Sequence, residues 1–320
     1  LKGDHPWLIF PEGAMIKDKK IIENGKFRIR EAQGPSRPPH TGAAALALRA
    51  VFFRKRLHRL QELDQDLMQK QLAELNLNSI DEVTGQQTYL VPVNLSYYPL
   101  RSRKNGLERM VSTLKPDIAP RFQDELRTEG TMLLSGVSMG VSIGTPIAVE
   151  HWLDKKIIKR DINSLNLIHL RDSLPSTPLL RSTARRLTDD AMASIYRHTQ
   201  INWDHLAAYL IEYHPDSCFS VADLANRLCL ALEMSSQMDI SRIHPSLRSA
   251  KKIGSCNGFN SYLVDFLKMA EQSGAVSLNG DVICKNHLSD SRSLDFHTIR
   301  MANPYQVILN EVEFLRHVTK

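Results

Sequence analysis

The sequence contains little cysteine, with four residues among 320 and no Cys-x-x-Cys pair. Closely paired cysteines are typical of zinc sites, and a dense set in a short chain is typical of a disulfide scaffold. Both classes are therefore excluded, and we expect ordinary reduced thiols of the kind found in a cytosolic protein. The four residues are Cys218, Cys229, Cys256 and Cys284.

The spacing of a metal-binding helix is also missing. His198, His205 and His214 recur at intervals of seven and nine residues. Two ligands lie on one face of a helix when they are four residues apart, as in zinc-binding helices. We therefore expect polar histidines here and no metal site.

The sequence lacks a long, purely apolar run. Residues 130–149 carry no charge, but they include four glycines and Pro146. A membrane-spanning helix needs about 20 predominantly apolar residues. This composition favours two short strands, over residues 131–137 and 141–149, and argues against a spanning helix.

The sequence is rich in positive charge, since 41 Lys and Arg against 35 Asp and Glu leave a net charge of +6. This balance favours anionic partners such as phosphate esters, acidic lipid headgroups or nucleic acid. Five cations accompany Phe52 and Phe53 in one helical stretch. They indicate either an interfacial patch for anionic lipid or a solvated helix face whose aromatic rings pack inward. These cations are Arg49, Arg54, Lys55, Arg56 and Arg59.

The first half of the chain has the pattern of an α/β sheet. Trp7–Phe10 runs directly into Pro11, Glu12 and Gly13, which predicts a buried strand that ends in a tight turn. In a parallel sheet, ligands bind at the carboxyl ends of strands. A helix capped by Thr41 is predicted next, and it continues to about residue 76. A strand follows over 88–96, with Pro92 at an edge or at a strand end. A helix over 106–129 and the two strands named above complete this half.

The second half is predicted to be mainly helical. Proline and serine in residues 172–183 indicate a linker, which divides the chain into domains over 1–171 and 184–320. Helices are predicted over 184–199, 203–213, 221–233 and 259–273. Alternation around Asn279-Gly280 predicts a hairpin over 274–284, and a helix followed by a hairpin indicates a winged-helix-like unit.

A central buried strand needs neighbours on both sides, and nothing precedes Trp7–Phe10 that could supply one. The chain also begins with Leu1 in place of Met. We therefore expect the chain to be a fragment of a longer protein whose fold begins upstream.

Four segments occur in an order that resembles the glycerolipid acyltransferase family, which includes lysophosphatidic acid and glycerol-3-phosphate acyltransferases. They are Phe10–Gly13, Gly42–Leu48, Val91–Val93 and Ile143–Ile147, so the resemblance covers about residues 1–150. It implies a partial acyltransferase-type sheet flanked by helices. It also implies acyl transfer from acyl-CoA or acyl carrier protein to a hydroxyl of glycerol phosphate or a lysophospholipid, with no cofactor.

The family's catalytic pair is a His-x-x-x-x-Asp motif that precedes the Phe-Pro-Glu-Gly segment. None of the twelve histidines here has Asp five positions on. The resemblance therefore implies an O-acyltransferase when full-length, with no catalytic residue in this chain, which should be inactive alone. The alternative is a non-catalytic protein that keeps the acyltransferase shape.

The resemblance implies a substrate-binding role for the residues that match the family's motifs, and for the nearby Lys17. Glu12 would position substrate or orient the absent histidine; alternatively it bonds nearby backbone N–H groups as a turn residue. The family often continues with Thr-Arg-Ser, whereas here Lys17 is the nearest cation and could act as a point charge for phosphate or lie in a solvated loop. The full set is Phe10, Pro11, Glu12, Gly13, Lys17, Val91 and Pro92.

The resemblance also implies a location and partners. We expect a cytoplasmic protein, peripheral at the inner face of the cell membrane, with contact to anionic lipid. The rival reading is a nucleic-acid-binding protein, based on the basic charge and the possible winged helix. Asp281 and Asp290 in the hairpin region argue against it.

Overall fold

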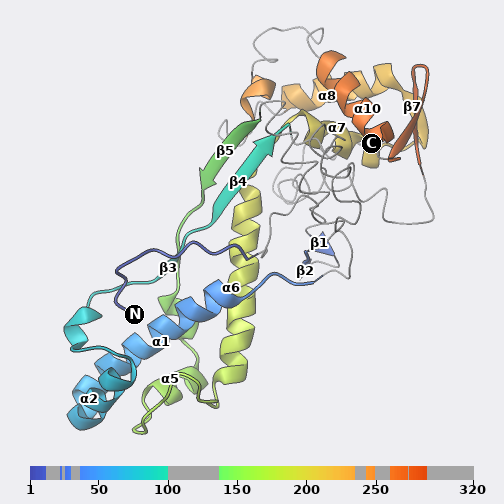
Figure 1. Cartoon of the computed structure of the whole chain (residues 1–320). Coiled ribbons are helices and arrows are strands. Elements are labelled where there is room, and N and C mark those ends of the chain that lie inside the picture. Colours follow the sequence, from blue (N-terminus) through green and yellow to red (C-terminus); the bar gives the residue numbers. More distant parts are fainter. Residues whose placement is uncertain are drawn as a thin grey trace, which may run out of the picture. The chain divides into compact units, whose positions relative to one another are not determined.

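The computed structural model describes residues 1–11, 22–23, 26–29, 37–99, 137–234, 243–248, 260–272 and 274–286. It is a mixed α/β structure, about half helical. The chain forms two compact units, each built from separated segments (Figure 1). The first unit comprises Leu1–Met15, Pro39–Pro92 and Gly144–Ser194, and the second comprises Ile16–Pro38, Val93–Ile143 and Ile195–Lys320.

Two consecutive helices open the first unit and confirm the predicted helical stretch. α1 spans Gly42–Leu63 and α2 spans Gln65–Glu74. Asp64 separates them, and its side chain caps α2 by accepting a hydrogen bond from the Leu67 N–H at 2.9 Å. Small residues at the start of α1 let it pack closely, and Ala44 and Leu48 are buried. Thr41 occupies the predicted cap position, but its side chain makes no capping bond.

Short elements complete the first unit. A 3-10 turn η1 over Ile80–Glu82 precedes β3 (Tyr89–Leu90), which pairs antiparallel with β6 (Ile147–Ala148). The 3-10 turn η2 (Glu150–Leu153) and helix α5 (Lys156–Ile162) follow.

Helix α6 spans Thr177–Arg197 and corrects the predicted linker, because it begins inside residues 172–183. The Ser176 carbonyl accepts the first helical hydrogen bond, from the Leu180 N–H at 2.8 Å. Pro178 lies in the first turn, where a missing N–H costs nothing. The proline that suggested a linker is therefore part of a helix start.

The predicted strand over Trp7–Phe10 is wrong. These residues have no strand structure, and Trp7 and Leu8 are 78% and 77% exposed. A strand forms only where another backbone lies alongside it, and no ladder in the described part of the chain includes this segment. Every described ladder is antiparallel, so the rule that ligands bind at the carboxyl ends of parallel strands does not apply to these ladders.

The second unit holds two small ladders and a three-stranded sheet. β1 (Ile22–Glu23) pairs with β2 (Lys26–Phe27), and β4 (Val93–Tyr98) pairs with β5 (Ser138–Ile143) over six residues. The strand predicted over 88–96 is thus two strands, β3 and β4, with Pro92 at the break between them. The helix predicted over 106–129 and all but the last residue of the strand predicted over 131–137 lie outside the described residues.

The helices predicted over 203–213, 221–233 and 259–273 and the final hairpin are confirmed within a few residues. The sheet order is β7-β9-β8, with every pair antiparallel. A buried core that includes Leu206, Leu228 and Phe266 joins the helices to this sheet. The elements are α7 (Trp203–Glu212), β7 (Cys218–Ser220), α8 (Val221–Met234), α10 (Asn260–Gln272), β8 (Val276–Asn279) and β9 (Val282–Lys285).

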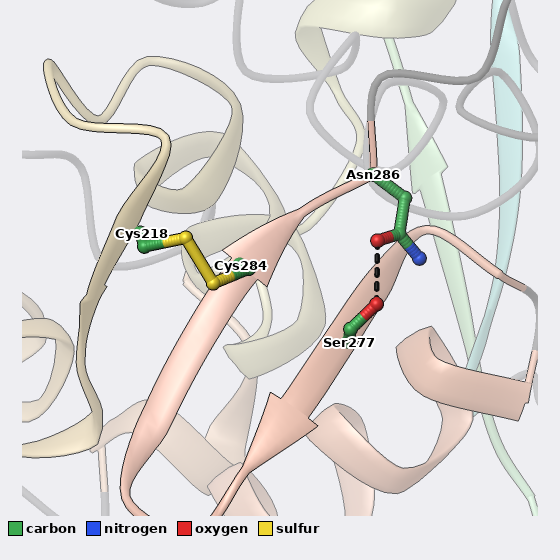
Figure 2. The surroundings of a disulfide bond; sticks show 4 residues. All are labelled: Cys218, Ser277, Cys284 and Asn286. Carbon is green, nitrogen blue, oxygen red and sulfur yellow. Dashed lines mark hydrogen bonds between the residues drawn. A yellow bond between two sulfur atoms is a disulfide. The ribbon is translucent and has the colours of Figure 1, made fainter.

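The prediction of reduced thiols is wrong, because Cys218 and Cys284 form a disulfide (Figure 2). The two residues are directly opposite in the β7–β9 ladder, and the Lys285 N–H donates to the Ser217 carbonyl beside them. The cysteines thus occupy a non-hydrogen-bonded pair, where opposite side chains are closest. Cys229 is disulfide-bonded as well. Such pairing depends on strand register, which spacing along the chain does not reveal.

Candidate functional site

The predicted site residues that the structure describes fall on two segments of the first unit. Phe10 is exposed, while Pro11 is half-buried and its carbonyl accepts a hydrogen bond from the His40 N–H at 2.7 Å. Val91 is exposed and Pro92 is buried. Among the described residues no hydrogen bond joins these two segments. Glu12, Gly13 and Lys17 lie outside the described residues.

The N-terminal segment is held along α1. The Leu1 carbonyl accepts a hydrogen bond from Arg54 at 3.5 Å, and Lys2 pairs with Glu82 at 2.9 Å. Pro11 is held at the other end by His40, just before the helix. From Gly42 to Arg54 the helix rises about 18 Å, which eleven extended residues span easily. The segment therefore runs toward the amino end of α1 and places Pro11 there.

This arrangement has a simple electrostatic consequence. The amino end of a helix carries partial positive charge and N–H groups without partners in the helix. The Thr41 side chain, at the cap position of α1, makes no hydrogen bond to these N–H groups. The structure thus places Pro11 beside a terminus whose chemistry suits a phosphate.

Pro92 lies at the point where the described strands change partner. Its carbonyl accepts a hydrogen bond from the Gly144 N–H at 2.8 Å. A proline has no N–H to give to a ladder, so the break between β3 and β4 at this residue is the expected result. The Val91–Pro92 and Gly144–Ile147 segments are therefore in direct contact through the backbone.

A buried arginine links these strands to α1. Arg54 donates to the Thr88 hydroxyl and lies 3.7 Å from Glu150, while the Thr88 N–H donates to the same Glu150 oxygen at 2.8 Å. Burial lowers the pKa of Arg54, and the Glu150 carboxylate opposes that shift. This group joins α1 to the residue before β3 and to η2, so we assign it a structural role.

A second arginine on α1 is fully buried. Arg56 donates to Gln71 at 3.0 Å and to four backbone carbonyls, two in the last turn of α5 and two just after it. Gln71 in turn donates to the Ile168 carbonyl at 2.8 Å and accepts from its N–H at 3.2 Å. Burial lowers the pKa of Arg56 to about 10. The four carbonyls belong to Asp161, Ile162, Ser164 and Asn166.

These contacts remove Arg54 and Arg56 from the membrane patch that the sequence indicated as one of two alternatives. Arg54 and Arg56 are buried, as are Phe52 and Phe53, so they cannot meet a lipid surface. The inward packing of the aromatic rings is confirmed, but the helix face is not simply solvated. A local signal was present, because Arg56 lies four residues from both Phe52 and Leu60, on one apolar stripe.

The second unit contains a hydrogen-bonded histidine that sequence reasoning treated as an ordinary polar residue. His214 contacts Asp223 at 2.7 Å, and Arg227 contacts the same oxygen at 2.8 Å. The other ring nitrogen accepts from the Asp216 N–H at 3.1 Å. Hydrogen bonds from His214 and Arg227 lower the pKa of Asp223. Both nitrogens of His214 are therefore engaged in hydrogen bonds.

The described residues lack two features that would bear on function, a membrane-spanning helix and a metal-binding cluster. No helix in this part of the chain is both long and apolar enough to cross a membrane. No three His, Cys, Asp or Glu side chains in the same part gather closely enough to hold a metal ion.

Comparison with protein-family models, with curated proteins and with solved structures found no match to this chain.

The second unit should lose stability as the pH falls below about 6.5, because His244 is held in its neutral form. Its Nδ1 accepts from the Ser246 N–H at 3.2 Å, its ring lies edge-on to Tyr98, and burial followed by the Arg248 charge lowers its pKa. A lowered folded pKa means that stability present above the unfolded pKa is lost as pH falls through the folded value. Urea titrations across this range should show the loss, and His244→Gln should flatten it. An unchanged pH profile in this variant would contradict the assignment.

Proposed function

We propose that this chain is part of an O-acyltransferase that moves an acyl group from a thioester to a hydroxyl of glycerol phosphate or a lysophospholipid. The supporting observation is that parts of all four motif segments fall in the first compact unit. Within it, Pro11 lies beside the amino end of α1, and Pro92 contacts Gly144. Segments that are far apart in sequence thus belong to one compact unit, which supports the proposal.

In this proposal the general base comes from polypeptide outside these 320 residues. A histidine there takes the proton of the attacking hydroxyl, and an aspartate holds the imidazole in the required tautomer. The present chain contributes acceptor binding: Glu12 positions the hydroxyl group, and Lys17 supplies a positive charge for phosphate, as the resemblance implies. Acyl-CoA or acyl carrier protein is the co-substrate, and no cofactor takes part.

The proposed location is the inner face of the cell membrane. Disulfides are rare in cytosolic proteins, so the Cys218–Cys284 bond removes the argument from reduced thiols. The proposed cytoplasmic location is therefore supported only by the proposed acyl donors, acyl-CoA or acyl carrier protein. The absence of a spanning helix among the described residues is compatible with peripheral attachment.

We further infer that α7 to β9 form a winged-helix-like unit. Helix, strand, helix, helix and hairpin follow in order, and the first strand, β7, pairs with the last, β9. The exposed side of α10 carries Asp265, Lys268 and Glu271, and Asp281 lies at the hairpin turn. Nucleic-acid binding depends on cations that neutralise phosphates. This acidic surface favours a protein-binding or structural role over nucleic-acid binding.

The experiment that tests the proposal uses the protein joined to the polypeptide that precedes it in its gene. Transfer of labelled acyl groups is measured with both donors, and with glycerol 3-phosphate and lysophosphatidic acid as acceptors. We expect transfer by the longer protein and none by this chain alone. Glu12→Gln should lower kcat/KM by roughly 100-fold, whereas Glu62→Gln, exposed on α1, should leave it unchanged.

Two results would oppose this proposal. Failure of the folded longer protein to transfer acyl groups from either donor to any acceptor would rule out the activity. Full activity in Glu12→Gln would keep the activity but remove the role assigned to Glu12.

A further inference from the structure

The β4–β5 ribbon has one entirely apolar face. Its six residue pairs run from Val93 opposite Ile143 to Tyr98 opposite Ser138. Side chains alternate between the two faces of a strand pair, so every second residue shares a face. One face carries Val93, Leu95, Tyr97, Met139, Val141 and Ile143, and the other carries Asn94, Ser96, Tyr98, Ser138, Gly140 and Ser142.

The apolar face is the one exposed to solvent. Met139, Val141 and Ile143 are 60%, 55% and 68% exposed, and Leu95 is 39% exposed. An antiparallel sheet with one solvated face normally turns its polar face outward. Here that order is reversed.

The polar face packs inward. Asn94 is buried, and its amide donates to the Thr199 hydroxyl at 3.0 Å. Gly140 lies so close to Ser96 and Gln200 that an added Cβ would come within 2.9 Å of the Ser96 hydroxyl. The contacts of the polar face thus fix which way the ribbon is turned, and the outward direction of the apolar residues follows from the register.

A second copy of the chain is a poor occupant for this face. A stable protein interface takes about 800 Å² and 20–30 residues from each partner, whereas the apolar face offers six side chains in three pairs. The area buried by two such faces stacked together would be that of a weak contact between molecules. A specific partner would also be expected to meet charged or hydrogen-bonding groups, and β4 and β5 contain no Asp, Glu, Lys or Arg.

We propose that the apolar face of the β4–β5 ribbon enters the boundary between headgroups and acyl chains of a lipid bilayer. Hydrocarbon accepts uncharged apolar side chains without shape complementarity, and a small surface is enough for reversible attachment. Tyr97 suits such a boundary, where one end of the ring is apolar and the other is wet. The strands lie flat at this depth, because their open backbone edges need water.

This attachment differs in chemistry from the basic patch that the sequence indicated, since it does not depend on anionic headgroups. It also goes beyond the proposed activity, because the ribbon would bind lipid whether or not the protein transfers acyl groups. Vesicle binding and catalysis can therefore fail independently of each other.

The test is sedimentation of the full 320-residue chain with vesicles of pure phosphatidylcholine and with vesicles containing equal phosphatidylglycerol, each at low and high salt. We expect binding to both, with little effect of salt. Val141→Asp, at the centre of the apolar face, should weaken partitioning about tenfold. Leu230→Asp is the matched control, because Leu230 on α8 is an apolar residue whose exposed fraction of 52% is close to the 55% of Val141.

If circular dichroism shows that Val141→Asp alters the fold, a second variant keeps the test decisive. Val141→Trp should show fluorescence that brominated acyl chains quench beyond the quenching of the parent protein. The proposal is overturned if phosphatidylcholine vesicles do not bind the chain, or if binding requires phosphatidylglycerol and disappears in salt. It is also overturned if the parent is a dimer that Val141→Asp converts to a monomer, because a second copy then covers the face.

Discussion

Replacing Arg56 with methionine is expected to lower the free energy of unfolding by about 3–5 kcal/mol. The substitution keeps a side chain of similar length but removes every donor that Arg56 supplies to Gln71 and to the carbonyls at and just after the end of α5. Asp161 and Ile162 are buried, so their carbonyls would lose these bonds with little access to water. Urea unfolding followed by circular dichroism measures the loss.

The physical setting of Arg56 explains why the expected effect is large. Among the described residues no carboxylate pairs with the guanidinium; backbone carbonyls do, two of them from Asp161 and Ile162 at the carboxyl end of α5. That end of a helix carries partial negative charge and stabilises a cation. With a pKa of about 10, Arg56 stays charged at neutral pH. One residue thus holds the chain after α5 against α1 and α2.

Two variants on α1 serve as controls for Arg56→Met. Arg56→Lys keeps the charge but has three donors where arginine has five, so its stability should fall between those of the parent and Arg56→Met. Arg59→Met removes an exposed cation paired with Glu62 and should change stability by less than about 1 kcal/mol. Equal stability of Arg56→Met and Arg59→Met would contradict the role of the buried network.

The second large effect is expected from removing the Cys218–Cys284 disulfide. The bond joins residues 66 positions apart. Closing a loop of that length in the unfolded chain is worth about 4 kcal/mol by chain entropy. The double substitution of both cysteines by serine should therefore lower the melting temperature of the second unit, as followed by calorimetry.

Ser277→Ala is the comparison for this disulfide variant, because it removes one hydrogen bond from the same sheet, between Ser277 and Asn286 at 2.5 Å (Figure 2). Its expected cost is about 1 kcal/mol. Reductant should lower the stability of the parent protein at least as far as the double serine variant, since Cys229 is also disulfide-bonded. An unchanged melting temperature in the double variant would mean that the bond contributes nothing to stability in solution.

The helices of the second unit were predictable because their signals are local. Asn202 precedes α7 and caps it through a hydrogen bond from the His205 N–H at 3.0 Å. The hairpin was predictable for the same reason, since Gly280, the first of the two turn residues, adopts a positive φ of 60°, which glycine tolerates. Signals of this kind need no knowledge of the rest of the chain.

The candidate site was predictable only in part. The contact of Pro92 with Gly144 agrees with the expectation that Pro92 lies at a strand end. The roles of Glu12, Gly13 and Lys17 stay predictions. Trp7–Phe10 was misjudged, because an apolar run shows that a segment can be buried but does not show that a neighbouring strand exists.

The amino-acid sequence by itself determined the helices α1, α7, α8 and α10 and the final hairpin, because helix periodicity, caps and turn residues act within a few positions. Only the tertiary structure decided that Arg56 is buried, that Cys218 meets Cys284, and that the β4–β5 ribbon turns its apolar face outward. Each of these depends on which segments, distant in sequence, pack against each other. Local residue spacing does not predict such packing or the register between distant strands.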